Sequence, residues 1–228
     1  MPANSLPPTV LAFLRDLAKH NDRTWFAGQK ARYERDVQQP VLAFVEAMAP
    51  RLRKVSRHVV ADPRKAGGSM MRIHRDTRFS KDKRPYKTNV GIQFRHKAGK
   101  DVHAPGLYVH IEPGTVFLGA GLWHPEREAL QGIREAIAAK PTAWLAARDH
   151  APFRKAFALE GDSLKRAPAG YSPDDPMIED LRRTDFIAVR RLKERDVTST
   201  SFADDVAKAF GHATPFMRFL CKAVGVGY

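Results

Sequence analysis

Cysteine is almost missing from the 228-residue sequence, in which Cys221 is the single thiol. One cysteine excludes a disulfide within the chain and a metal cluster held by several thiolates. No apolar run approaches the length of about 20 residues that spans a bilayer. Residues 1–8 lack the basic segment and apolar core of a signal peptide. We therefore expect a cytoplasmic protein without a membrane-spanning segment.

Acidic residues are also scarce, with 25 Asp and Glu against 39 Lys and Arg, which gives a net charge of +14. This excess favours anionic partners in general. The hydrophobic fraction of 43% and the charged fraction of 28% are ordinary for a globular protein. The length allows one large domain or two small ones. We predict a single domain over residues 1–228, with a smaller helical lobe from about residue 160 as the alternative.

Several motifs with known chemistry are incomplete or absent. The triplet His-Arg-Asp at 74–76 matches a protein-kinase triplet, but Lys81 occupies the expected asparagine position and no glycine-rich loop precedes it. No Walker phosphate loop occurs, and the Gly-Ala-Gly at 119–121 lacks the third glycine of a dinucleotide fingerprint. The Pro-Cys-x-x-Cys of zinc deaminases is missing as well. No standard cofactor motif is left, and we predict no cofactor.

The positive charge is densest between residues 72 and 97, where nine basic residues face two acidic ones, Asp76 and Asp82. The local charge of +7 is half of the net charge of the chain. A disordered basic tail is usually a plain block of like charge. Here apolar and acidic residues separate the basic ones, which indicates an ordered element. The basic residues are Arg72, Arg75, Arg78, Lys81, Lys83, Arg84, Lys87, Arg95 and Lys97.

Alternation of side chains predicts strands on both sides of residues 80–88, which we call the basic loop. A strand over 71–79 would have two faces, one with Met71, Ile73, Arg75, Thr77 and Phe79, the other with Arg72, His74, Asp76 and Arg78. Apolar alternation at 90–94 and 107–111 and a run at 115–118 predict three further strands. Short loops between sequential strands favour an antiparallel meander at about 70–118.

Helical periodicity and capping residues predict helices before and after the meander. The first three begin at about residues 8, 22 and 40, and Pro50 is expected to kink or end the third. Later helices are predicted at about 125–139, 142–149, 177–183, 201–211 and 214–224, with a strand at 186–192. The expected fold is α+β, with the meander packed against N-terminal and C-terminal helices and a polar sheet face left for a site.

The polar residues of the loop and of the sheet face form the candidate site. Arginine's planar fork and lysine's point charge suit phosphate or carboxylate groups. We predict an anion-recognising pocket, which in an enzyme would act on a phosphorylated small molecule, and we assign no catalytic residue. Lys83, Tyr86 and Lys87 are expected to serve the ligand, whereas Ile73 and Phe79 are expected to be buried. The predicted ligand-binding residues are Arg72, Arg75, Asp76, Arg78, Ser80, Asp82, Lys83, Tyr86, Lys87, Tyr108 and His110.

Other interpretations of the basic stretch remain open. It can be solvated surface charge, or an internal network that pairs arginines with Asp76, Asp82 and Glu112 and specifies structure without a ligand. A third interpretation is a non-specific nucleic-acid-binding module that uses the loop on phosphates and Tyr86 or Trp123 for stacking. Outside that case, Trp25 and Trp123 are expected in the core.

A metal site is also conceivable on the strand faces. His74 and Asp76 form one pair two residues apart, and His110 and Glu112 form another, which is legitimate ligand spacing. Neighbouring arginines oppose a bound cation, and we therefore predict no metal site.

The string Arg-Ile-x-Arg-Asp-x-Arg-Phe-Ser-x-Asp-Lys-x-Pro-Tyr-Lys-Thr at 72–88 resembles the signature of an uncharacterised family of conserved hypothetical proteins, domain of unknown function 2461. Residues 21–33, with Asn-Asp-Arg-Thr-Trp-Phe at their start, are similar to the same family, and so are residues 108–125. In the latter, Gly-Ala-Gly stands where the family often has three glycines. The resemblance covers roughly residues 10–220. It implies a family but brings no activity with it.

Overall fold

Six strands form one sheet in the computed structural model, which describes residues 4–78, 81–98 and 104–228. The spatial order is β1-β2-β3-β4-β6-β5, and every neighbouring pair is antiparallel. The predicted strands at 90–94, 107–111, 115–118 and 186–192 are all present. The strands are β1 Val59–Val60, β2 Val90–His96, β3 Gly106–Glu112, β4 Thr115–Leu122, β5 Ala158–Glu160 and β6 Phe186–Leu192.

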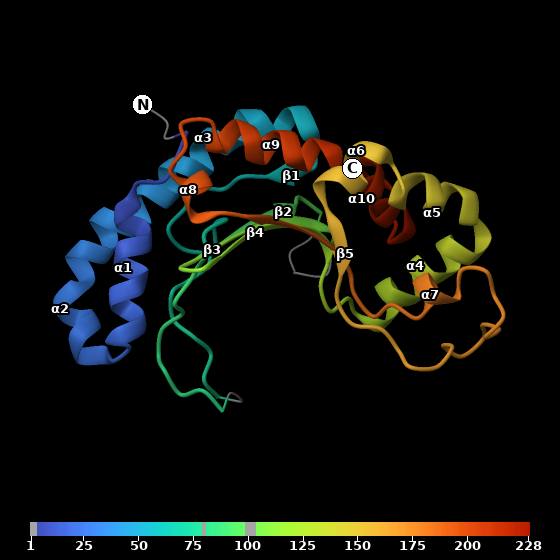
Figure 1. Cartoon of the computed structure of the whole chain (residues 1–228), viewed down its shortest axis with the longest axis horizontal. Helices are drawn as coiled ribbons and strands as arrows, with labels where there is room; N and C mark the ends of the chain where they lie inside the picture. The colour runs from blue at the N-terminus through green and yellow to red at the C-terminus, as the bar shows by residue number, and fades with distance from the viewer. Residues whose placement is uncertain (1–3, 79–80, 99–103) are drawn as a thin grey trace.

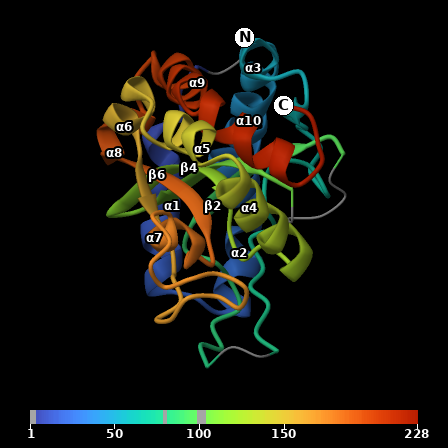
Figure 2. The same ribbon diagram turned by 90° about the vertical axis from the view of Figure 1, so that its right-hand side faces the viewer.

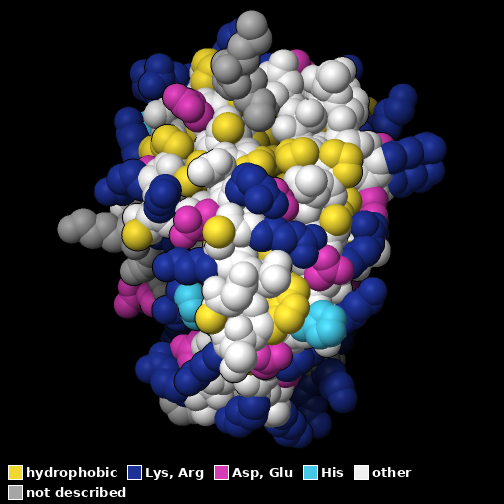
Figure 3. Space-filling view, turned by 90° about the vertical axis from the view of Figure 1, so that its left-hand side faces the viewer, with side chains coloured by type: hydrophobic (Ala, Val, Ile, Leu, Met, Phe, Trp, Pro, Cys, Tyr) yellow, Lys and Arg dark blue, Asp and Glu magenta, His cyan; other side chains and the backbone are white. Residues whose placement is uncertain are grey.

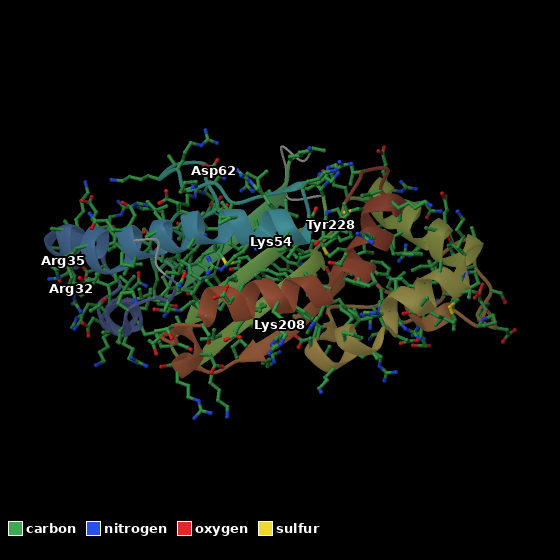
Figure 4. All side chains as sticks on the ribbon, turned by 90° about the horizontal axis from the view of Figure 1, so that it is seen from above. Arg32, Arg35, Lys54, Asp62, Lys208 and Tyr228 are labelled. Atoms are coloured by element: carbon green, nitrogen blue, oxygen red, sulfur yellow. The ribbon has the colours of Figure 1, made fainter. Side chains whose placement is uncertain are left out.

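The sheet has one apolar face and one polar face because its strands alternate. On β3, Leu107, Val109 and Ile111 are buried, and the residues between them are only half-buried. Helices α3 (Gln39–Val55) and α9 (Phe202–His212) cover the apolar face, as Figure 1 shows. Seen from above in Figure 4, these two helices run side by side across the strands. The polar face therefore lies on the opposite side of the sheet from these two helices.

The remaining helices flank the two ends of the sheet. Helices α1 and α2 stand at one end, and α4, α5 and α7 at the other (Figures 1 and 2). The predicted α+β class, with helices before and after the meander, is confirmed. The bounds are α1 Pro8–Lys19, α2 Arg23–Tyr33, α4 Arg127–Ala139, α5 Pro141–Arg148, α6 Ala151–Ala156, α7 Ile178–Leu181, α8 Glu194–Val197 and α10 Thr214–Ala223.

Helices α2 and α3 join without a break through one π-helical turn, Glu34–Gln38. Pro40 has no N–H for the carbonyl of Asp36, and the chain widens here, with the Gln39 N–H donating to the carbonyl of Glu34. The freed carbonyl of Asp36 accepts from the Thr9 hydroxyl at 3.4 Å.

Helix α3 continues to Val55, so the expectation that Pro50 could end it is wrong. Pro50 and Glu46, whose carbonyl loses its donor, are both exposed. Water can therefore satisfy that carbonyl, and the helix tolerates the proline.

The strand predicted over 71–79 does not form within the described residues. Residues 69–75 run antiparallel to 85–93 through two isolated bridges, Met70 with Ile92 and His74 with Tyr86. The two bridges differ in register by two residues, so a bulge interrupts the ladder. Residues 72, 74, 76 and 78 are still the more exposed set, as the alternation predicted. Phe79 lies outside the described residues, whereas Ile73 is buried as expected.

One hydrophobic cluster connects the sheet to the C-terminal helices. Phe94, Phe186, Phe210 and Phe216 are fully buried in it. Strand β6 lies between β4 and β5, so residues beyond 160 contribute to the same sheet. Residues before and after 160 thus share one sheet and one core cluster. In the described part of the chain, no helix is long and apolar enough to cross a membrane.

A glycine pair tests how tightly β4 is packed. Gly121 has φ +123°, and a Cβ there would lie 2.0 Å from the carbonyl oxygen of Phe186. Gly114 has φ +83°, but its Cβ would meet nothing within 4 Å. We expect Gly121→Ala to lower the free energy of unfolding by about 3 kcal/mol or more, and Gly114→Ala by only about 1 kcal/mol. Chemical denaturation measures both, and equal losses would contradict the packing described here.

Candidate functional site

The basic loop projects from the body of the protein (Figures 1 and 2). Asn21 fixes its base through two hydrogen bonds. The Asn21 amide donates to the carbonyl of Tyr86 at 3.0 Å and accepts from the Tyr86 N–H at 3.1 Å. The Tyr86 ring stacks on Phe26, with centroids 4.1 Å apart, and its residue is 6% exposed. Tyr86 therefore anchors the loop, and the expectation that it serves a ligand more than the fold does not fit its position.

A hydrogen-bonded network lies on the polar face of β3. The Tyr108 hydroxyl is 3.2 Å from Nδ1 of His110, and Nε2 of His110 is 3.3 Å from Oε2 of Glu112. The Thr88 hydroxyl donates to Oε1 of Glu112 at 2.5 Å, which joins the network to the base of the loop. The Asn89 amide lies 3.5 Å from Nδ1 of His110. Sheet and loop thus share one polar cluster.

Burial sets the protonation of this network. It lowers the pKa of His110, and the neighbouring Glu112 carboxylate partly opposes the shift. Burial, with a smaller contribution from Glu112, raises the pKa of Tyr108 to about 12. His110 stacks on Phe117 with centroids 4.6 Å apart, which shields its ring from water. Near neutral pH, both side chains are therefore uncharged. His110 can accept a proton, whereas Tyr108 takes part only through hydrogen bonds.

Three cations gather where the loop meets the sheet, namely Arg72, Arg75 and Lys87, and we call them the cation cluster. Lys87 is half-buried, and its pKa is lowered by burial and then by Arg72 and Arg75. The side chains of Arg72 and Lys87 make no hydrogen bond or ion pair within the described ranges. Arg75 donates from Nη1 to Asp82 at 2.7 Å, but its buried Nε has no hydrogen-bond partner among the described residues.

The carboxylates of the loop and of the segment before it are occupied by nearby arginines. Asp82 binds Arg84 at 2.7 Å as well as Arg75, and Asp76 binds Arg78 at 2.7 Å. The hydrogen bond from Arg84 holds the pKa of Asp82 far below its usual range, and the bond from Arg78 does the same for Asp76.

The internal network of arginines with Asp76, Asp82 and Glu112, which was one interpretation of the sequence, is therefore present only in part. Glu112 bonds to Thr88 and His110, and no ion pair joins it to the arginines 72, 75 or 78 among the described residues. The ion pairs that do form in and beside the loop are partly exposed, with 76% of the Arg78 side chain accessible. Such pairs contribute little to stability.

Other predicted site residues lie outside the cation cluster. Lys83 is exposed and donates to the carbonyl of Thr77 at 3.0 Å. Ser80 lies outside the described residues. The His74 ring packs near Tyr86, with centroids 5.3 Å apart. No group of three or more His, Cys, Asp or Glu residues that could hold a metal ion occurs in the described part of the chain.

Sequence patterns gave no sign of two features of the site. Asn21 begins the string at 21–33 that resembles the family, but its pairing with Tyr86, which lies 65 residues away in sequence, has no local signature. Trp123 was expected in the core, but it is 66% exposed. Trp25 is half-buried and packs against the core, as expected.

The comparison with protein families agrees with the resemblance seen in the string at 72–88. The chain matches the profile of the conserved hypothetical protein family DUF2461 over residues 9–219, which includes the loop, the network and the cation cluster. It belongs to this family. Searches of curated proteins and of solved structures gave no match. The family description states no activity, and the function has to be inferred from the site itself.

A substitution of Glu112 tests the network. We expect Glu112→Gln to lower the pKa of His110 further, because the carboxylate that favours the charged ring is removed while burial remains. An NMR titration of the His110 ring measures this shift. A pKa that rises or stays unchanged would show that Glu112 does not act on His110.

Proposed function

We propose that the chain binds a small anion, a phosphate or carboxylate group of a small molecule, at the cation cluster. The observation that carries this proposal is the balance of charge. Arg72, Arg75 and Lys87 lie together. Asp82 is shared between Arg75 and Arg84, and Asp76, which also attracts Arg72, is bound by Arg78. Like charges that lie near one another repel, and after burial this repulsion contributes to the lowered pKa of Lys87. A bound anion reduces it.

Arg75 supports the same conclusion through its unpaired donor. A buried donor without a partner costs about 1–3 kcal/mol, and the buried Nε of Arg75 has none among the described residues. A guanidinium binds an oxyanion through two parallel N–H groups. With Asp82 on Nη1, the Nε–H is the group left for a ligand oxygen, and because it is buried, binding must uncover it. Arg75 can therefore bridge Asp82 and the anion.

Lys87 favours a small anion over the backbone of a nucleic acid. Phosphate backbones are usually bound by long, exposed basic side chains, whereas Lys87 is half-buried between the loop and the sheet. On the face shown in Figure 3, Lys and Arg side chains are interleaved with Asp and Glu and do not form one continuous patch. The exposed charge of this face is typical of a solvated surface.

The network on β3 determines what a bound molecule would meet next. The Thr88–Glu112 hydrogen bond connects the loop to His110 and Tyr108. Thr88 follows Lys87 in the chain, and we propose that His110 is the proton carrier that a phosphorylated molecule held at the cation cluster would meet. Our proposal extends to an enzyme acting on a phosphorylated small molecule, in which His110 accepts or donates the proton.

Substitution of Lys87 separates binding from stability. We expect Lys87→Met to weaken sulfate binding by about tenfold or more, because a charge-assisted hydrogen bond is lost. It should leave the free energy of unfolding unchanged or raise it, because a half-buried charge beside two arginines is removed. Isothermal titration with sulfate and thermal melts measure the two quantities.

Lys83→Met is the matched control, since Lys83 is exposed and lies on the same loop. It should change both quantities little. If Lys87→Met destabilises the chain and leaves sulfate affinity intact, Lys87 belongs to the fold and the binding proposal fails.

The proposal also predicts the pH dependence of binding. Because the pKa of Lys87 is lowered from its ordinary value of 10.5, the amine loses its proton earlier than an exposed lysine as the pH rises. Sulfate keeps its charge over this range, so its affinity should fall as the pH approaches the lowered pKa from below. Lys87→Arg, which stays charged, should remove this decline. A decline of equal size in the Lys87→Arg variant would exclude Lys87 as its source.

A further inference from the structure

Two aromatic rings stand together at the end of β4, away from the cation cluster. The rings of Trp123 and His124 have centroids 4.4 Å apart and an interplanar angle of 32°. Trp123 is 66% exposed, and the His124 side chain is 62% exposed. Single exposed aromatic residues are common on protein surfaces. A closely spaced pair of rings, both open to water, is a different feature.

The backbone brings these two rings together. In a regular strand, successive side chains point to opposite faces. His124 has φ 49°, in the left-handed region, and it is the only non-glycine residue with positive φ in the described ranges. This turn places the His124 ring beside that of Trp123. The conformation costs free energy, so other contacts must hold it.

Asp185 supplies those contacts from below the surface. Its carboxylate is 1% exposed and accepts from the His124 N–H at 2.7 Å. The same oxygen lies 3.3 Å from Nδ1 of His124, and the other oxygen accepts from the Asp162 N–H at 3.0 Å. The carboxylate favours a proton on Nδ1 and leaves Nε2 free toward solvent. The exposed ring pair therefore rests on a rigid buried support.

We propose that Trp123 and His124 form a stacking site for a planar heteroaromatic ring of the nucleobase type. Indole offers a large apolar face that loses little conformational entropy when it stacks. Nε2 of His124 can hydrogen-bond to a ring edge. Both oxygens of Asp185 accept hydrogen bonds within the protein, so this carboxylate does not bind the hydroxyls of a sugar.

The charge of the chain favours an anionic source of the ring. At +14, the protein attracts nucleotides and repels organic cations. The ring could belong to a free mononucleotide or to a single-stranded nucleic acid, which share this chemistry. Register places the pair at one end of β4, next to Gly121 and Gly106, whereas His110 pairs with Phe117 toward the other end. The site is thus separate from the cation cluster.

Saturation-transfer NMR tests the ring directly. The probes are adenosine, AMP and ribose 5-phosphate, so that the base and the phosphate are examined separately. We expect the adenine ring protons of adenosine and AMP to be saturated by the protein. Trp123→Ala should abolish that signal and Trp123→Phe should keep part of it. His124→Gly, which suits positive φ and removes only the ring, should weaken it.

A labelled oligodeoxyadenylate distinguishes the two sources. Loss of one stacked base weakens binding by about tenfold or more, so fluorescence anisotropy should show that change in Trp123→Ala if the source is a single strand. Unchanged oligonucleotide affinity together with loss of the AMP signal assigns the site to free nucleotides. Lys87→Met leaves the ring signal of adenosine unaffected, which separates this site from the anion site. Adenine signals that are absent from the native chain, or equal in Trp123→Ala, would overturn the proposal.

Discussion

The pairing of the Asn21 amide with the backbone of Tyr86 is the constraint on which the site depends. It satisfies both the N–H and the carbonyl of Tyr86 and holds the Tyr86 ring against Phe26 in the core. It adds to two backbone hydrogen bonds at the base of the loop, from the Arg75 N–H to the carbonyl of Pro85 at 2.9 Å and from the Lys87 N–H to that of Ile73 at 2.8 Å. Exposed like charges on a free loop separate into water at little cost. Held at the sheet, the half-buried Arg75 and Lys87 have less of this freedom than the exposed Arg72.

The cation cluster has little negative charge beside it, because the acidic side chains of this region are bound to other groups. Residues 72–88 contain two carboxylates, and both are taken by arginines close in sequence, Asp76 by Arg78 and Asp82 mainly by Arg84. Glu112, which lies near the cluster, is bonded to Thr88 and His110 instead. A chain selected for stability alone would pair or replace the half-buried Lys87. The presence of Lys87 here fits a ligand that supplies the counter-charge.

Much of the fold could be predicted from the sequence, because alternation on β2 and β3 and the periodicity of α1, α9 and α10 are local signals. The prediction of a strand at 71–79 was wrong. Alternation of polar and apolar residues indicates which side chains are exposed, and exposure does alternate over 71–78, but only isolated bridges form there instead of a continuous strand pairing. β1 and β5 are too short to carry a period. The helix break expected near Pro40 was overridden by a π-helical turn, which no propensity predicts.

The site could be predicted only as a set of residue types. The sequence indicated Arg72, Arg75 and Lys87 in and beside the loop and Tyr108 and His110 on the polar face, because strand alternation and local charge are visible in it. It could not show that Tyr86 turns inward or that Asn21 receives it, since that contact joins residues far apart in the chain. The exposure of Trp123 was equally hidden, because it depends on the backbone at His124 and on Asp185.

The most direct measurement is the position of an anion in crystals soaked with selenate, located by its anomalous scattering. If the cation cluster is an anion site, the strongest selenium peak lies within hydrogen-bonding distance of Nε of Arg75 and Nζ of Lys87, with the Arg72 guanidinium turned toward it. If selenate occupies other surfaces while Arg72 and Lys87 form ion pairs with carboxylates of the chain, the cluster belongs to the fold and the central claim is contradicted.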